Sequence, residues 1–318
     1  MPEPTGLTGG TGPGRPRSVA LVVNPSAAKG RAQDLLPEVA GRLRDAGHAV
    51  DVLLSRSPAE APALVARAAA GGADVLAVMG GDGMAHLGLN AVADHVAAHP
   101  GSDLALGLVP AGTGNDFARA LGLDPGDVGA AVAALDGGAA RPVDLLRTAD
   151  RWVGTVVATG FDALVNARAN RMRRPRGSAR YTIAVLAEVR TFRPLPYVLE
   201  VDGERRELEA MFVSVGNTSS FGGGLRICPD ADPYDGLLDV TVIHPVTRAG
   251  LLRLLPQMRT GRFAADPCVE QLRGRSVRVV GGAGTAYGDG EELGPTPVAV
   301  RSVPGAIRVC LPGPTSSS

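Results

Sequence analysis

The first half of the chain repeats a pattern of short apolar runs followed by amphipathic segments. The apolar runs lie at 18–23, 48–54, 74–79 and 104–109. Between them, apolar side chains recur at the spacing of a helix face, as Leu35, Val39 and Leu43 do after the first run. Strands that alternate with helices predict a mostly parallel sheet with right-handed connections and helices on both faces.

The pattern changes near Arg141, after a helical stretch at 128–135. Strand-like segments then dominate, at 151–159, 197–201, 208–215, 238–243 and 276–280. Asp202-Gly203 is a strong signal for a two-residue hairpin turn. With helices expected at 178–189 and 249–258, this half predicts an antiparallel, sandwich-like domain. The cleft between the two domains is the default ligand site.

We therefore predict an α/β protein whose first domain, Rossmann-like and mostly parallel, spans residues 18–141. The antiparallel β-sandwich domain is expected at 142–304. Residues 1–17 and 313–318 are rich in small and polar residues and are expected to be disordered.

Composition narrows the class of protein. The formal net charge of zero argues against a dedicated nucleic-acid binder. No apolar run approaches the roughly 18–20 residues of a membrane-spanning helix, and no leader pattern opens the chain, so we expect a cytoplasmic protein. The three scattered cysteines fit a reducing compartment without a zinc site.

Two glycine turns end neighbouring strands of the predicted parallel sheet, at Gly80–Gly83 and Gly112–Asp116. Such sheets bind ligands outside the carboxyl ends of their strands, and a helix amino end attracts phosphate. We expect Asp82, Thr113, Asn115 and Asp116 to converge on one crevice. Taken alone, a glycine turn that only crosses the sheet edge is an equally good interpretation.

The first predicted strand ends in a turn that contains Asn24, Ser26 and Lys29. These residues are candidates for a further phosphate contact. A solvated loop between strand and helix is the alternative, and it is favoured when this turn is considered alone.

Four blocks in order carry a resemblance to a known family. They are Gly80-Gly81-Asp82-Gly83, Gly112-Thr113-Gly114-Asn115-Asp116-Phe117, the stretch from Gly222-Gly223-Gly224 to Asp235-Gly236-Leu237-Leu238-Asp239, and Asp289-Gly290-Glu291. From about Ser18 to Leu311 the chain resembles the bacterial diacylglycerol kinase catalytic-domain family of soluble lipid kinases. The resemblance implies ATP in a cleft between a nucleotide-binding domain and a larger β-sandwich domain. It also implies that residues 305–312 return to the first domain.

The resemblance implies a role for each matching residue. Glu291 matches the general base, with Asp289 beside it, and Asp82 would lie near the magnesium that accompanies ATP. The nucleotide would contact Gly80, Gly81, Gly83, Gly112 and Thr113, and Ser55 stands where the family often has an ATP-contacting threonine. A structural magnesium loop would use the carboxylate of Asp235 and the carbonyls of Asp232 and Leu237. From local sequence alone, a plain Asp-Gly turn explains this loop equally well. For Glu291, a solvated turn acid is the favoured interpretation from local sequence alone.

The chain departs from the family pattern directly after the first glycine turn. The family usually has Thr, a small apolar residue, Asn and Glu, whereas Met84, Ala85, His86 and Leu87 stand here. The change removes a hydroxyl that could cap the helix or contact phosphate. Backbone amides remain, so a phosphate site is still expected, and His86 is interpreted as structural rather than as a replacement ligand.

Six arginines lie between Asp162 and Glu188, a stretch that contains no acid. They are Arg168, Arg171, Arg173, Arg174, Arg176 and Arg180. Such a cluster can contact an anionic membrane surface. A solvated arginine-rich loop is the alternative.

The leading hypothesis is an ATP-dependent kinase that phosphorylates a lipid hydroxyl at the inner membrane surface, with diacylglycerol giving phosphatidic acid. A kinase for a long-chain base or another lipid alcohol is the nearest alternative. A catalytically silent nucleotide- or lipid-binding module is the alternative of another class. A dinucleotide kinase shares the glycine-aspartate turn, but its Asn-Glu block is missing. A homodimer is a candidate assembly, and no nucleic-acid partner is expected.

Overall fold

In the computed structural model, the described residues are 15–25, 27–57, 59–137, 139–172, 174, 178–189, 193–282 and 284–312. The predicted disordered segments therefore fall mostly outside this part. The described chain begins just before the first strand, where the backbone N–H of Arg17 donates to Nδ1 of His48 at 3.1 Å.

The first domain contains a four-stranded parallel sheet in the order β2-β1-β3-β4. Its strands are β1 (Ser18–Val23), β2 (Ala49–Leu54), β3 (Val75–Gly80) and β4 (Ala105–Pro110). Its helical segments are η1 (Ala27–Gly30), α1 (Arg31–Asp45), α2 (Ala61–Ala70), α3 (Asp82–Ala98), α4 (Asp116–Ala120) and α5 (Val128–Asp136). The prediction of a mostly parallel α/β domain is confirmed.

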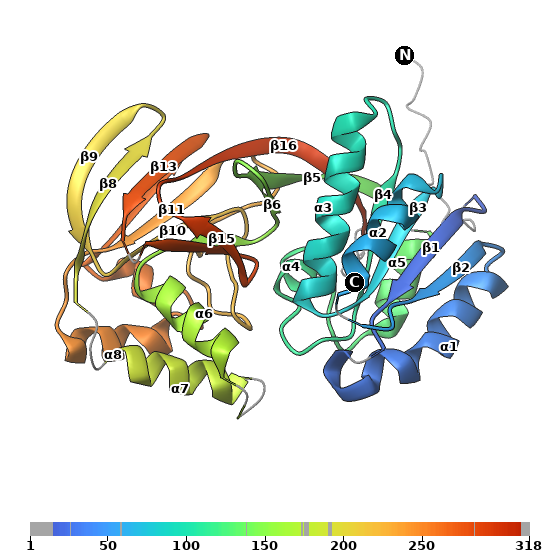
Figure 1. The fold of residues 1–318 in the computed structure, drawn as a ribbon, viewed down its shortest axis with the longest axis horizontal. Helices are drawn as coiled ribbons and strands as arrows, with labels where there is room; N and C mark the ends of the chain where they lie inside the picture. The colour runs from blue at the N-terminus through green and yellow to red at the C-terminus, as the bar shows by residue number, and fades with distance from the viewer. Residues whose placement is uncertain are drawn as a thin grey trace, which may run out of the picture.

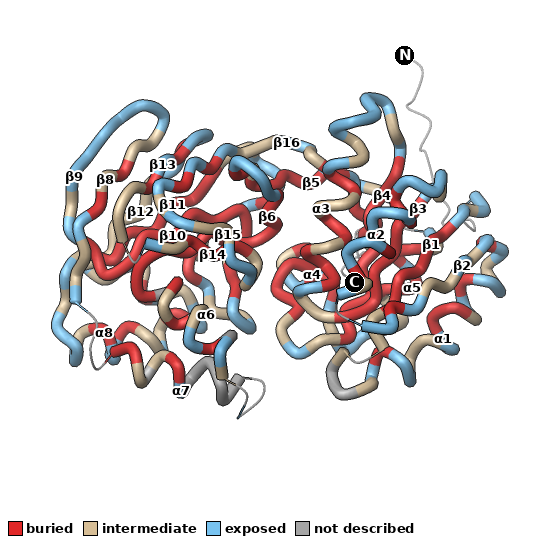
Figure 2. The backbone as a smooth tube through the Cα atoms, viewed as in Figure 1, coloured by how far each residue is buried: buried red, intermediate tan, exposed pale blue. Residues whose placement is uncertain are grey.

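Helices cover both faces of this sheet (Figure 1). Helices α2 and α3 pack on the side chains of Ala20, Leu76 and Leu106, whereas α1 and α5 pack on the alternate positions, such as Leu21 and Ala77. Strands β3 and β4 are buried along their whole length (Figure 2). This two-sided burial explains why their sequences are continuously apolar.

The second domain is a β-sandwich. One layer contains β5 (Ala140–Arg147), β6 (Trp152–Val153), β8 (Leu195–Val201), β9 (Glu204–Ala210), β13 (Ser276–Gly281) and β16 (Val298–Cys310). The other contains β7 (Val156–Ala158), β10 (Phe212–Gly216), β11 (Leu238–Ile243), β12 (Val269–Gly274), β14 (Thr285–Gly288) and β15 (Glu291–Pro295). Val213, Val240, Val277 and Val300 belong to one buried cluster that fills the space between the layers.

Helices α6 (Phe161–Arg171), α7 (Ser178–Val189) and α8 (Arg248–Gln257) form a layer beside the second sheet (Figure 1). A separate apolar cluster joins them to the sheet through residues such as Phe212 and Leu254. The short helix η2 (Arg262–Ala265) follows α8.

Strand β16 crosses from one domain to the other (Figure 1). Its first half pairs with β13, and its last residues pair in parallel with β4 through Arg308 and Val309. The last residues of β16 therefore lie against the first domain, and the two domains share one ten-stranded sheet. This continuous strand limits how freely the domains can move relative to each other.

Some of the predicted turns and strands agree with the structure, and others differ from it. The predicted hairpin turn joins β8 and β9, with Asp202 and Gly203 both at positive φ. The segment predicted as one strand at 151–159 is split by Gly154 and Thr155, and the one at 208–215 is split at Met211. Helix α6 was not predicted, because its short apolar stripe is interrupted by arginines and asparagines.

Candidate active site

The two glycine turns are in van der Waals contact at the carboxyl edge of the parallel sheet. Gly80 is the register partner of Pro110, so β3 and β4 end side by side. A Cβ atom on Gly112 would lie 2.4 Å from the Cα of Gly81, which no side chain can tolerate. Glycine is needed here because two backbones approach each other closely. The predicted convergence of the turns is therefore present in the structure.

Asp82 holds the second turn against the first. Its carboxylate accepts hydrogen bonds from the backbone N–H groups of Asn115 at 2.9 Å and Asp116 at 2.6 Å. A Cβ on Gly114 would lie 2.3 Å from Oδ2 of Asp82, so the turn closes tightly around the carboxylate. Asn115 adopts the left-handed conformation with φ of 56° and caps α4. Asp82 thus fixes the relative position of the two glycine turns.

The amino end of α3 begins at the first of these turns. Gly81 is the N-cap residue, and no side chain caps the helix. The first N–H groups of a helix have no partner within the helix, so they are available to an anion. The side chain of Met84 is buried beneath the turn, where its Cγ occupies the space that a Cβ on Gly80 would need. Met84 therefore supports the turn from below.

The remaining predicted nucleotide contacts lie at the ends of neighbouring strands. Asn24 follows β1, and its N–H donates to the carbonyl of Met79 at 3.1 Å. Ser55 follows β2, is buried, and donates its hydroxyl to the carbonyl of Ser57 at 2.7 Å. Thr113 is exposed. Ser26 and the side chain of Lys29 lie outside the described residues.

Asp116 links the glycine turns to the second domain. Its carboxylate accepts hydrogen bonds from the N–H groups of Gly223 at 2.8 Å and Gly224 at 2.9 Å. Burial and the nearby charge of Asp82 raise the pKa of Asp116 to about 6, and the two glycine N–H groups only partly offset them. Two glycines of the Gly222-Gly223-Gly224 triplet therefore donate backbone hydrogen bonds to a carboxylate of the first domain.

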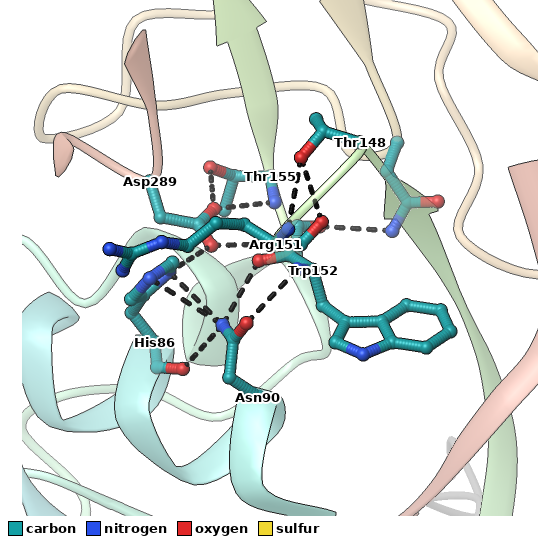
Figure 3. Close-up of polar contacts among 9 residues, drawn as sticks. His86, Asn90, Thr148, Arg151, Trp152, Thr155 and Asp289 are labelled. Carbon is teal, nitrogen blue, oxygen red and sulfur yellow. Dashed lines mark hydrogen bonds and ion pairs between the residues drawn. The ribbon is translucent and has the colours of Figure 1, made fainter. Parts of the chain in front are cut away.

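A second interdomain contact joins α3 to the turn between β14 and β15. Nδ1 of His86 lies 2.9 Å from Oδ2 of Asp289, and both side chains are almost fully buried. The two side chains point toward each other (Figure 3). The carboxylate also accepts hydrogen bonds from the N–H of Gly154 and from the N–H and hydroxyl of Thr155, at 3.0, 2.8 and 2.6 Å.

Four hydrogen bonds thus fix the Asp289 carboxylate in place. Burial by itself would raise the pKa of Asp289, but His86, Thr155 and Gly154 outweigh burial and hold that pKa below its usual range. Asp289 is at positive φ, followed by Gly290 at positive φ, so the chain turns sharply here. An ionised carboxylate held this firmly sets the position of the residues that follow it.

Glu291 emerges from this turn with its side chain exposed. It lines a cavity of about 530 Å³ between α6 and the β14–β15 hairpin. The other lining residues are Ala163, Leu164, Ala167 and Arg171 of α6 and Thr285, Tyr287 and Glu292 of the hairpin. The cavity combines three apolar side chains of α6 and Arg171 with the acidic and hydroxyl groups of the hairpin.

In the predicted magnesium loop, the positive charge beside the acids comes from an arginine side chain. Arg273 contacts the carboxylate of Asp235 and also pairs with Asp239 at 3.2 Å. Asp235 further accepts the N–H of Leu237 at 2.9 Å, and the side chain of Asp232 accepts the N–H of Tyr234 at 3.1 Å. Among the described residues, no group of three or more His, Cys, Asp or Glu side chains is arranged to hold a metal ion. The guanidinium thus neutralises the carboxylate that a magnesium ion would need.

The arginine cluster lies only partly within the described residues. Arg168 pairs with Glu188 at 2.5 Å, and Arg171 donates to the carbonyl of Ala167. Arg174 is exposed. The side chains of Arg173, Arg176 and Arg180 lie outside the described residues. No helix in the described part of the chain is both long and apolar enough to span a membrane.

Sequence reasoning missed the partners that hold the site together. His86 was expected to be structural, but its pairing with Asp289 was not foreseen. Asn217 was also missed: its side chain donates to the carbonyls of Asp144 and Gly154 at 2.8 and 2.9 Å. The available signal was the replacement of the family's usual asparagine by His86, which marks a position with a particular partner.

Two family matches cover the chain in succession. Residues 18–148 match the diacylglycerol kinase catalytic domain, and residues 155–311 match the YegS C-terminal NAD kinase beta sandwich-like domain.

Known relatives span nearly the whole length. A diacylglycerol kinase of Mycobacterium tuberculosis (strain CDC 1551 / Oshkosh) is 40% identical over 300 residues, covering 92% of this chain and 95% of the relative. A Stenotrophomonas maltophilia (strain K279a) protein named "Probable lipid kinase YegS-like" is 30% identical over 311 residues, covering 92% and 95%. A crystal structure from Bacillus anthracis str. Sterne aligns with a TM-score of 0.76 at 22% identity over 93% of this chain and 98% of its own, a likeness of fold alone.

Proposed function

Because the chain belongs to the diacylglycerol kinase family of lipid kinases, we propose that it transfers the γ-phosphate of ATP to the hydroxyl of diacylglycerol, giving phosphatidic acid. One observation carries the proposal. The turn that presents Glu291 is bonded through Asp289 to His86, on the same helix whose amino end forms the glycine-turn crevice. A candidate proton acceptor and a candidate phosphate site are thus fixed to one rigid element.

The donor nucleotide is assigned to the crevice at the ends of β1 to β4. The N–H groups at the start of α3 and the turn at Gly112 and Thr113 would contact the phosphates, and Asn24 and Ser55 lie at the adjacent strand ends. The nucleotide-binding domain of this proposal comprises residues 18–141 together with 305–312, and residues 142–304 form the lipid-kinase domain.

Glu291 is assigned as the general base. Its carboxylate accepts the proton of the lipid hydroxyl as that oxygen forms a bond to the γ-phosphorus of ATP. The bond between that phosphorus and the bridging oxygen breaks, and ADP leaves with the electron pair. Positioning and electrostatic stabilisation supply most of the rate enhancement in such reactions.

Asp289 is assigned a supporting part in catalysis. Its oxygens are already occupied by His86, Gly154 and Thr155, so its contribution is to hold the turn that carries Glu291. Asp82 orders the second glycine turn and lies near the expected phosphate position. When bound with ATP beside Asp82, magnesium would neutralise charge on the phosphate oxygens. Asp232, Asp235 and Leu237 present hard oxygens, but because Arg273 compensates Asp235, no step depends on a metal there.

The cavity beside Glu291 is assigned to the acceptor head. Ala163, Leu164 and Ala167 present an apolar wall for the first methylenes of the acyl chains. Burial and the nearby carboxylate of Glu292 raise the pKa of Tyr287, whose hydroxyl donates to Oε2 of Glu292 at 3.4 Å. The acceptor lies in a membrane, so we propose transient contact of the enzyme with the inner membrane surface, assisted by the exposed arginines near α6.

A long-chain base is a second candidate acceptor. The cavity contains both Glu291 and Glu292, and these two carboxylates would also attract an ammonium group. The cavity thus accommodates either a neutral glycerol head or an amino alcohol.

A lipid panel assayed with radiolabelled ATP tests the proposal. The panel contains diacylglycerol, a long-chain base and ceramide, each presented to wild type, Glu291→Gln and Asp82→Ala. The expected result is a labelled phosphatidic acid product with wild type that is strongly reduced with both variants. If wild type binds ATP and vesicles but labels none of the lipids, the protein is a silent binding module and the enzymatic proposal fails.

A further inference from the structure

A groove lies on the outer face of the sandwich layer that contains β5, β8, β13 and β16, apart from the proposed active site. It has a volume of about 370 Å³ and is formed by strands β5, β8, β13 and β16. The inner face of the same strands, with Val277, Val279 and Val300, packs against the sheet that carries Glu291. The groove therefore opens on the side of the sheet opposite to the acceptor cavity.

Three arginines meet in this groove. Arg147 on β5 is the direct cross-strand partner of Arg301 on β16. Arg278 lies on the neighbouring strand β13. Its cross-strand partners are Ala299 on β16, two residues before Arg301, and Glu200 on β8. Like charges that face each other across strands destabilise a sheet. None of these three arginines forms an ion pair within the described part of the chain, and Glu200 is the only acid that lines the groove.

The guanidinium of Arg147 is packed against an aromatic ring rather than extended into solvent. Its guanidinium carbon lies 4.7 Å from the centre of the Trp152 ring, which holds the group over the indole face. Its Nη1 atom is buried and has no hydrogen-bond partner in the described structure. Buried donors of this kind are nearly always paired in folded proteins. The guanidinium of Arg147 is thus held at the groove by Trp152, with no acidic partner among the described residues.

We propose that the groove is a binding site for a phosphate-type oxyanion, held by Arg147, Arg301 and Arg278. Arginine presents planar, forked donors that match phosphate oxygens, and an anion between the three side chains would relieve their mutual repulsion. The shared chemistry is a phosphate group, supplied either by a free anion or by the headgroup of an anionic lipid. The site does not depend on the proposed kinase reaction.

The chain contains its own reporter for this site. Trp152 is the only tryptophan in the sequence, and it is the residue on which Arg147 stacks. A ligand that engages Arg147 is therefore expected to change the tryptophan emission. Trp152 also forms hydrogen bonds with Asn90 and Asp94 of α3, the helix that begins at the first glycine turn. The nucleotide site is therefore kept saturated with ADP throughout, so that the emission change reports the groove.

The test is a fluorescence titration of the full chain with inorganic phosphate in the presence of saturating ADP, with chloride at matched ionic strength as the salt control. A saturable change with phosphate and none with chloride is expected. Arg301→Ala, an exposed position, should weaken the apparent affinity by about tenfold or more. Arg259→Ala removes an exposed arginine far from the groove and should titrate like wild type. Circular dichroism confirms that the variants are folded.

A vesicle arm separates the two sources of the phosphate group. Phosphatidylglycerol vesicles are compared with phosphatidylcholine vesicles by the same emission change. Saturation with inorganic phosphate alone supports a site for a free anion, and an Arg301-dependent change with phosphatidylglycerol supports a headgroup site. The proposal is overturned if neither probe gives a saturable change, or if Arg301→Ala titrates like wild type.

Discussion

His86 and Asp289 lie 203 residues apart in the sequence, yet Nδ1 of His86 and Oδ2 of Asp289 are 2.9 Å apart at the junction of the two domains. The pair joins the helix that begins at the glycine turn to the turn that carries Glu291. It therefore connects the proposed donor site and the proposed base through two buried side chains.

Breaking this pair should impair catalysis more than nucleotide binding. His86→Ala leaves the buried Asp289 carboxylate without one partner, and we expect a loss of about 2–4 kcal/mol in the free energy of unfolding. The kcat should fall by about tenfold, with little change in KM for ATP, because the turn with Glu291 is displaced while the glycine turns remain. Chemical denaturation and steady-state kinetics measure both effects.

Asp94→Asn provides the matched control for His86→Ala. Asp94 lies on the same helix and accepts a hydrogen bond from Nε1 of Trp152 at 2.8 Å, but it does not contact the turn. The Asp94→Asn substitution should lower the free energy of unfolding by about 1 kcal/mol and leave kcat unchanged. Equal losses of kcat in the two variants would show that the helix as a whole, rather than the His86–Asp289 pair, is responsible.

The pH dependence of stability distinguishes Asp289 from Asp116. The native pKa of Asp289 is lowered, so its contribution to stability is complete above the ordinary carboxyl range and is lost as the pH falls through the native pKa. The stability difference between wild type and Asp289→Asn should therefore shrink at acidic pH. Urea unfolding across a pH series measures it, and a difference that grows toward acid would contradict the assignment.

Asp116 should show the opposite sign. Its native pKa is raised to about 6, so its contribution to stability is complete below its unfolded pKa of 3.8 and is lost as the pH rises through about 6. Between about pH 4.5 and about pH 7.5, Asp116→Asn should become more stable relative to wild type by about 2 kcal/mol. Parallel pH profiles for the two proteins would refute the raised pKa.

The contact between the glycine turns predicts a steric effect. Gly112→Ala places a Cβ against the Cα of Gly81, so the turns must separate. ATP affinity should fall at least about tenfold, because a displacement of the phosphate-binding backbone is costly. Gly41→Ala, in the middle of α1 where a Cβ meets nothing within 4 Å, should instead stabilise the protein by about 0.5–1 kcal/mol. Isothermal titration calorimetry with ATP compares the two, and equal affinities would contradict the packing argument.

The loop at Asp232 to Leu237 should be insensitive to chelators while Arg273 is present. The guanidinium of Arg273 pairs with both Asp235 and Asp239 and offsets part of their charge, so removing divalent cations should leave the wild-type Tm unchanged. In Arg273→Ala the two carboxylates lose that charge, and magnesium should then raise the Tm. Thermal melts with chelator and with magnesium provide the comparison. A wild-type Tm that drops on chelation would show that a bound metal holds the loop.

The alternation of apolar strands and amphipathic helices was sufficient to predict the parallel sheet, and the rule for carboxyl strand ends correctly brought Asp82 to Asn115 and Asp116. Local pattern also located the Asp202-Gly203 hairpin. It did not find the pairing of His86 with Asp289 or the bonds from Asp116 to Gly223 and Gly224, because each depends on how the two domains pack. The role of β16 in both domains was implied by the family resemblance alone.

The most direct test of the central claim is the single-turnover rate of phosphate transfer from ATP to diacylglycerol in Glu291→Gln. This variant keeps the size and polarity of the side chain but cannot accept the proton. We predict a rate about 100- to 10,000-fold below that of wild type, with an unchanged Kd for ATP. A rate within about threefold of wild type would show that Glu291 is not the base.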